Sequence, residues 1–225
     1  MVSRTDTLSA ARPPLTKERV IRAAVDLADT GGIEALSMRK LGQSLGVEAM
    51  SLYNHAANKD EILDGIADAV IAKIEMVPPG DGWKAQLRAQ IAAGRHVLLR
   101  HPWAPRVIEA RPDAGPGALR YMEHVIGILR EGGFSLDLTH HAIHVLGSRI
   151  FGFTQELFDQ MGDQRPNPEV AAIMAREMAQ TFPYITELAT SVSHEGGLGG
   201  CDDDVEFFFA LDLILDGLER LRDAA

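Results

Sequence analysis

Between Pro14 and Pro78 the chain contains no proline, so nothing in this interval forces a break between its helical patterns. From Thr16 to Thr30, apolar residues recur three and four positions apart, which is typical of an amphipathic helix. Three further stretches follow, and each begins or ends at a residue that commonly caps a helix: MRKLGQSL between Ser37 and Gly46, EAMSLYNH, and KDEILDGIADAVIAKIE after Asn58. The pattern predicts four helices in one unit.

The two short central helices are predicted to form a helix-turn-helix. Four apolar residues are spaced to pack across the turn at Gly46, against the first and fourth helices: Leu41, Leu45, Val47 and Leu52. The second short helix then keeps small and polar side chains free, as in a helix that enters the major groove of DNA. These side chains are Ala49, Met50, Ser51, Tyr53, Asn54 and His55.

The remaining chain is also predicted to be helical. Helices are expected at 83–100, 117–130, 136–161, 169–181 and 205–222, with a proline-broken connector at 102–116 and a glycine-rich loop before the last helix. The fold class is therefore all-α: an N-terminal three-helix DNA-binding domain and a linking helix (16–75), then a larger helical domain (76–225). Residues 1–15 are expected to be a flexible arm.

Charge supports this division. The chain carries a net charge of −10, but residues 1–60 hold eight Lys or Arg and seven Asp or Glu, a net charge of +1. Only this first part is suited to approach a polyanion. Without a secretory signal or an apolar stretch that could cross a membrane, the protein is expected to be cytoplasmic, with no membrane partner.

Residues 16–75 resemble the DNA-binding domain of the tetracycline-repressor (TetR) family. The resemblance rests on the first helix, on SMRKLGQSLGV (37–47), on SLYNH (51–55) and on NKDEIL (58–63). It extends through GGFSL (132–136) and FFFALDLILDGLERL (207–221), where the chain is similar to the C-terminal domain type of the tetracycline-repressor members. The resemblance implies a ligand-responsive transcriptional regulator, a repressor in most cases, that binds a palindromic operator as a homodimer and is released by a small-molecule inducer.

Roles at the DNA follow from the same resemblance. Arg39 matches a residue that reads guanine, and Ala49, Met50 and Ser51 match the base-facing start of the recognition helix. Ser37 can hold a phosphate through its hydroxyl, and Tyr53, Asn54, His55 and Lys59 match phosphate-contacting or base-proximal positions. At Ala49 and Met50 the chain departs from the polar residue and the proline of the tetracycline-repressor members, so a different operator is expected.

The last helix is apolar on more than one side. Phe208, Leu211, Leu215 and Leu218 form one stripe, and further apolar residues lie on other faces. Burial on several sides fits either a central helix of a monomer or a helix covered by a second copy. The family resemblance implies the second, a four-helix dimer interface formed with the 136–161 helix.

The rear domain is expected to hold the small-molecule effector, and no further cofactor is required. Candidate pocket residues combine apolar walls with a few polar groups: His101, Trp103, Met122, His144, Arg149, Phe153 and Glu156. His101 and Glu156 match positions that hold a magnesium-bound drug in the tetracycline-repressor members, which leaves a metal-chelate inducer as a minority alternative. His140 and His144 stand four apart but lack the third ligand and glutamate of a metalloprotease helix, so no metal site is predicted.

Two other classes of function stay open. The chain could be a helical small-molecule-binding or interaction protein without operator binding. An enzyme is disfavoured because no set of nucleophile, base and acid is evident, and no catalytic residue is predicted.

Overall fold

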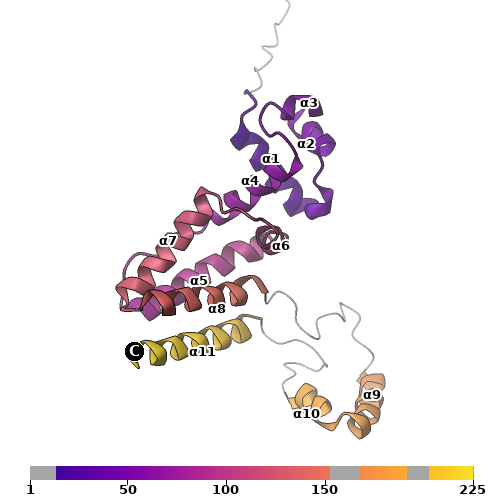
Figure 1. Cartoon of the computed structure of the whole chain (residues 1–225). Coiled ribbons are helices and arrows are strands. Elements are labelled where there is room, and N and C mark those ends of the chain that lie inside the picture. Colours follow the sequence, from indigo (N-terminus) through magenta and orange to yellow (C-terminus); the bar gives the residue numbers. More distant parts are fainter. Residues whose placement is uncertain (1–13, 153–167, 192–202, 225) are drawn as a thin grey trace, which may run out of the picture. The chain divides into compact units, whose positions relative to one another are not determined.

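The computed structural model describes residues 14–152, 168–191 and 203–224. Over these residues the chain is built from α-helices and one short 3₁₀ helix, with no strand (Figure 1). The first group of elements is α1 (Lys17–Gly31), η1 (Ile33–Ala35), α2 (Met38–Leu45), α3 (Ala49–Leu52) and α4 (Lys59–Ile71). The others are α5 (Trp83–Arg100), α6 (Ala104–Glu109), α7 (Pro116–Glu131), α8 (Leu136–Gly152), α9 (Pro168–Thr181), α10 (Pro183–Ser191) and α11 (Asp203–Asp223). The prediction of an all-α fold is confirmed.

The described chain divides into two compact units, and each is considered by itself. Unit 1 contains residues 1–75 and 94–122, and unit 2 contains residues 76–93 and 123–225. The division after Glu75 lies where the sequence places a domain boundary. Unit 1 also includes the segment 94–122, which the sequence assigns to the rear domain.

Unit 1 is held together by α1 and α4, which pack on each other and on the shorter helices. The two helices approach closely at Gly65, where a Cβ atom would lie only 2.4 Å from the Cδ1 atom of Ile21. Its core is apolar and fully buried, as the predicted periodicity requires. The central side chains are Val20, Ala24, Leu41, Leu52, Ile62, Ile66 and Val70.

The helix starts of unit 1 follow the capping rules. The side chains of Thr16, Ser37 and Asn58 each accept a hydrogen bond from the backbone N–H three residues later. Asn58 forms part of a reciprocal cap, because the Glu61 carboxylate reaches back to the N–H of Ala57 at 2.7 Å.

Several elements differ from their predicted bounds. The predicted recognition helix, α3, ends at Leu52, since the chain turns at Tyr53–His55 to reach the extended backbone that Asn58 needs as a cap. α4 is also shorter than predicted, whereas α6 adds a helical turn inside the predicted connector. Proline fits both α6 and the unpredicted α10 because it occupies their first turn, where its missing N–H removes no helical bond. Residues 153–161 of the predicted long helix lie outside the described residues.

Unit 2 has its own core between α8, α11 and the neighbouring parts of α5 and α7. The rings of Trp83 and Phe134 meet edge to face with centroids 4.6 Å apart, and a Cβ atom at Gly132 would come within 2.6 Å of Trp83. α9 and α10 pack on each other as a helical pair. Among the described residues, no helix has the length and apolarity to cross a membrane.

Candidate nucleic-acid interface

Two glycines shape the turn between α2 and α3. Gly46 ends α2 in the left-handed conformation, with φ 66° and ψ 36°, and its N–H bonds back to α2. A Cβ atom at Gly42 would lie 2.9 Å from the backbone oxygen of Val47 and 3.2 Å from the backbone of Ala49. The close approach of the two helices therefore requires glycine at position 42.

The predicted base-reading side chains lie at the surface of unit 1. Leu52 is the one residue of α3 that is fully buried, and it anchors the helix in the core. Met50 is 74% exposed and Tyr53 45%, large fractions for apolar and aromatic side chains. Arg39 is also exposed, and it has no hydrogen-bonding or ion-pairing partner in the described part of the chain. Of the residues predicted for base contact, Arg39 and Met50 are therefore exposed in the structure, and their role at DNA stays a prediction.

The other predicted contact residues flank this surface. Asn54 and Lys59 are exposed, whereas Ser37, Ala49, Ser51 and His55 are half-buried. Ser37 uses its hydroxyl oxygen to accept from the N–H of Lys40 at 3.3 Å. Its hydroxyl hydrogen remains available to an external acceptor such as a phosphate oxygen.

The start of α4 is joined to the start of α1 by an ion pair between Lys17 and Glu61, with the Nζ and Oε1 atoms 2.5 Å apart. This contact and the N–H of Ala57 lower the pKa of the Glu61 carboxyl below its ordinary value. The pair fixes the end of α4 that carries Lys59.

One side of α4 receives donors from Arg111, which lies between α6 and α7, and from the first turns of α7. The Arg111 guanidinium reaches Asp60 at 3.3 Å and Asp64 at 3.4 Å. One turn further along, Asp68 accepts from the N–H of Ala118 at 3.0 Å, so that it caps the start of α7 from another helix. The Arg120 side chain then donates to the carbonyl of Ala72 at 3.3 Å.

His101 and Trp103, predicted to line the effector pocket, lie buried in unit 1 and bond to α1. The Nδ1 atom of His101 and the indole nitrogen of Trp103 each lie 2.7 Å from Oδ1 of Asp29. The Nε2 atom of His101 lies 3.1 Å from the Nζ atom of Lys73, just beyond α4. Both polar edges of the imidazole are therefore occupied by side chains of this chain.

The remaining predicted pocket residues lie in different surroundings. Met122 and His144 are exposed. Arg149 is buried in unit 2, donates to the carbonyl of Glu206 at 2.9 Å and lies over the ring of Phe207. Phe153 and Glu156 fall outside the described residues. A ligand role for these residues stays a prediction.

The cluster His140, His141 and His144 lies on α8, with the rings of His140 and His144 4.6 Å apart. Within the described ranges, no three histidine, cysteine or acidic side chains are placed to hold a metal ion together.

Sequence reasoning missed the contacts that hold the segment 101–120 to α1 and α4, in which Asp29, Asp68, Lys73 and Arg111 take part. One signal was visible, since Asp60, Asp64 and Asp68 recur at intervals of four on α4 and so share a face. The other contacts join residues that are 28 to 74 positions apart, such as Lys73 with His101 and Asp29 with Trp103, and no local pattern marks them.

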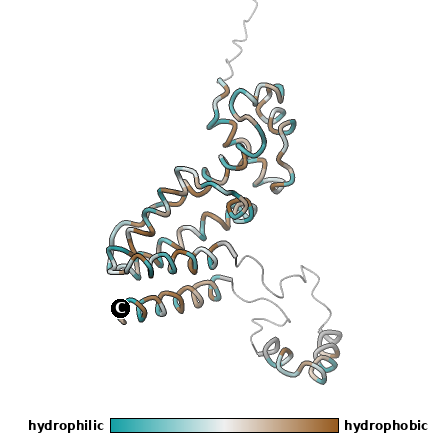
Figure 2. Tube along the Cα trace, viewed as in Figure 1, coloured by the Kyte–Doolittle hydropathy of each residue, from teal (hydrophilic) through white to brown (hydrophobic). Residues whose placement is uncertain are grey.

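The stripe of α11 that the sequence predicts for the dimer interface faces mostly into the core of its own chain. Leu211, Leu215 and Leu218 are buried within the single chain, and Phe208 is half-buried beneath the guanidinium of Arg88. A second copy could not reach the three leucines, because the protomer's own helices already cover them. Hydrophobic residues nevertheless recur along the whole helix (Figure 2), and those that remain exposed are Val205, Phe209, Leu213 and Leu221.

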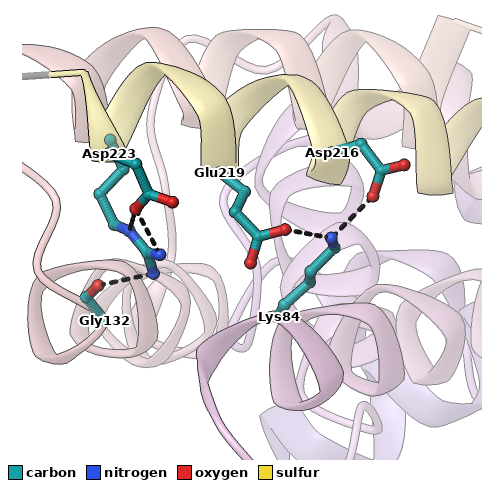
Figure 3. A network of polar contacts seen from close by, with 6 residues as sticks. Lys84, Gly132, Asp216, Glu219 and Asp223 are labelled. Carbon is teal, nitrogen blue, oxygen red and sulfur yellow. Dashed lines mark hydrogen bonds and ion pairs between the residues drawn. The ribbon is translucent and has the colours of Figure 1, made fainter.

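Ion pairs hold α11 against α5 in a fixed register. Figure 3 shows the ammonium group of Lys84 between the carboxylates of Asp216 and Glu219, at 2.7 and 2.5 Å. One turn along, Arg88 binds Asp212 through two nitrogens, at 2.6 and 3.1 Å. These contacts raise the pKa of Lys84 and lower that of Asp216, as expected for opposite charges in contact. They hold α11 with Leu213 facing away from the core.

Comparison with known proteins agrees with this architecture. Residues 20–66 match the family model described as "Bacterial regulatory proteins, tetR family", and residues 77–222 match "Tetracyclin repressor-like, C-terminal domain". A HTH-type transcriptional regulator of Saccharopolyspora erythraea is 42% identical over 132 residues, which cover 58% of this chain and 56% of that protein. The HTH-type transcriptional repressor DrrR1 of Streptomyces coeruleorubidus is 33% identical over 93% of this chain and 79% of its own length.

The fold is also similar to a solved regulator. Apo ActR of Streptomyces coelicolor superposes with a TM-score of 0.78 at 28% identity, covering 96% of this chain and all of that one. ActR in complex with actinorhodin gives a TM-score of 0.73 at 29% identity, over 93% of this chain and 99% of ActR. With both family models matched in order along its length, the chain belongs to the TetR family of ligand-responsive transcriptional regulators.

Proposed function

We propose that this protein is a homodimeric repressor that binds a palindromic operator through α2 and α3 and leaves it when a small molecule binds the rear domain. It acts by binding, without turnover of the ligand. The observation that carries the proposal is the surface of α3, where Leu52 alone is buried and Met50 and Tyr53 stay exposed. A short helix that is anchored by one buried residue and keeps large side chains exposed beside it is suited to enter the major groove.

Base recognition would combine contacts from one charged side chain and one apolar side chain. The free guanidinium of Arg39 can donate two hydrogen bonds to a guanine, and Met50 can contact a thymine methyl group. Lys59 and the Ser37 hydroxyl would hold phosphates on either side.

The second copy would cover the exposed stripe of α11, Val205, Phe209 and Leu213, rather than the buried leucines. An exposed phenylalanine and leucine on one helix face are typical of a surface that a partner covers. In a two-fold dimer the two recognition helices would meet successive turns of the same face of DNA, about 34 Å apart.

The effector is proposed to be a small organic molecule, because the related regulator ActR is solved with actinorhodin bound. Its binding would favour a conformation in which the two recognition helices no longer match the operator spacing.

The test is binding of the full-length protein to the DNA upstream of its own gene, at two salt concentrations, with the molecular mass recorded in parallel. The expected result is dimeric, salt-sensitive binding. Arg39→Ala should weaken it by about 1–3 kcal/mol, roughly fivefold to 150-fold, and relax sequence preference at one base pair.

Arg106→Ala, which removes an exposed arginine of α6, is the matched control and should bind as the unmodified protein does. Equally strong binding to unrelated DNA would contradict sequence-specific recognition. Equal weakening by Arg39→Ala and Arg106→Ala would contradict the base-contacting role of Arg39.

A further inference from the structure

The position of His101 bears on the chemistry of the effector. The resemblance to the tetracycline-repressor members implies a divalent cation at this residue, carried in by the drug. The contacts of the imidazole determine whether a cation fits there.

The contact with Asp29 is by itself compatible with a metal ligand. Metal-binding histidines commonly donate one ring N–H to a carboxylate and bind the metal through the other nitrogen. Nδ1 of His101 lies 2.7 Å from Asp29, and the remaining nitrogen is Nε2.

Lys73 occupies the place where the metal would bind. Its ammonium group lies 3.1 Å from Nε2, and an ammonium group can only donate. Nε2 must therefore accept, so a neutral imidazole carries its proton on Nδ1 and donates it to Asp29. A metal bound to Nε2 at about 2.0–2.2 Å would compete for the same lone pair and lie beside a positive charge.

No competing anion draws Lys73 away. In the described part of the chain its ammonium group has no carboxylate partner, and its one hydrogen-bonding partner is His101. Trp103 closes the other side, because its indole N–H donates to the same oxygen of Asp29. The hydrogen-bonded series Asp29–His101–Lys73 thus links three parts of unit 1: α1, the residues just before α6, and the residues just after α4.

We propose that His101 is a positioning residue held as the Nδ1–H tautomer, with Lys73 in place of a cation, so that the effector is recognised without a divalent metal on this histidine. The inference rests on the proposed function for the existence of an effector. The state of the imidazole itself is independent of it.

The first experiment reads the tautomer of each histidine by long-range ¹H–¹⁵N NMR of the full chain at neutral pH. His124 is the internal control, since its Nε2 atom lies 3.1 Å from the carbonyl of Val77 and must donate. The expected result is Nδ1–H for His101 and Nε2–H for His124, with signals assigned through His101→Gln and His124→Gln. If His101→Gln does not fold, Trp103→Phe, which removes the neighbouring indole, provides the assignment.

The second experiment adds Mn²⁺ alone to the same sample. Broadening of the His101 signal should be no greater than that of His124. Selective broadening of His101, or an Nε2–H tautomer at this residue, would overturn the proposal.

DNA binding is measured in parallel in the presence of EDTA. Loss of DNA binding with an intact Nδ1–H tautomer would count against the proposed function and leave the assignment of His101 standing. Operator binding together with an Nε2–H tautomer at His101 would support the proposed function and overturn the assignment of His101.

Discussion

At the scale of single residues, the start of α4 shows how one side chain serves two elements. Glu61 bonds to the N–H of Ala57, which completes the cap begun by Asn58, and it also pairs with Lys17 on α1. The carboxylate therefore stabilises the helix end that carries Lys59 and the junction of α1 with α4.

Substitutions at this cap separate the two contributions. Asn58→Ala should lower the free energy of unfolding by about 1 kcal/mol, because the N–H of Glu61 loses its acceptor. Glu61→Gln keeps an acceptor for Ala57 but loses the ion pair with Lys17, so its effect should depend on pH.

The direction of that dependence follows from the lowered pKa of Glu61. A group whose pKa is lower in the folded state stabilises the fold above its unfolded pKa, and this contribution is lost as pH falls through the folded pKa. The stability difference between the unmodified protein and Glu61→Gln should be largest near neutral pH and shrink below about pH 4.5. Chemical denaturation across this range measures it, and a difference that is independent of pH would contradict the assigned ion pair.

At the scale of elements, α7 begins where α4 provides its cap. Asp68 accepts a hydrogen bond from the N–H of Ala118. The start of α7 can come this close to α4 because Gly115 and Gly117 have no side chains. A Cβ atom at Gly115 would lie 2.5 Å from the Asp68 carboxyl group, and one at Gly117 would lie 2.9 Å from the Asp68 carbonyl oxygen.

Gly117→Ala is therefore expected to destabilise unit 1, because its methyl group meets backbone that cannot move aside cheaply. The loss should be about 1–3 kcal/mol, the usual cost of overpacking, measured by thermal unfolding. Gly127→Ala in the same helix is the matched control, since a Cβ atom there meets nothing within 4 Å. Alanine in place of glycine inside a helix should leave stability equal or higher at position 127. Equal losses at both positions would refute the crowding at Asp68.

At the scale of the whole molecule, the DNA-binding helices do not form a complete unit by themselves. The segment 94–122 belongs to unit 1 and covers it with Trp103 and Val107, which are both buried. Each large apolar side chain is worth about 1.5–3 kcal/mol when fully buried.

A fragment that ends at Glu75 should therefore be less stable than unit 1 in the full chain by roughly 3–6 kcal/mol, a large part of the 5–15 kcal/mol typical of a domain. Thermal unfolding followed by circular dichroism should show a low midpoint temperature or a broad transition for residues 1–75, and a cooperative transition for residues 1–122. If both fragments unfold alike at the same temperature, the segment 94–122 does not contribute as described.

The dimer makes a second prediction at this scale. Leu213→Glu places a charge on the exposed stripe of α11 and should yield a folded monomer with weakened operator binding. Leu215→Ala, only two residues away, removes a fully buried side chain and should cost about 2–5 kcal/mol of stability instead. Mass by light scattering and unfolding by denaturant distinguish the two effects. A dimeric Leu213→Glu protein would exclude this face as the interface.

The sequence by itself determined the features that depend on short-range patterns. Helix periodicity, the caps at Ser37 and Asn58 and the turn glycine Gly46 specified the helix-turn-helix, because each acts through residues at most four positions apart. The exposed residues of α3 could be predicted for the same reason, since one packing residue fixes the orientation of a single helical turn.

Only the tertiary structure decided which residues meet across long stretches of chain. It brought His101 and Trp103 to Asp29, joined Arg111 and Ala118 to the acidic face of α4, and chose which apolar stripe of α11 faces the core. Hydrophobic periodicity marks a helix that is apolar on several sides but cannot assign its neighbours, because burial is equally favourable against any apolar surface. Directional contacts such as Arg88 with Asp212 then settle the orientation.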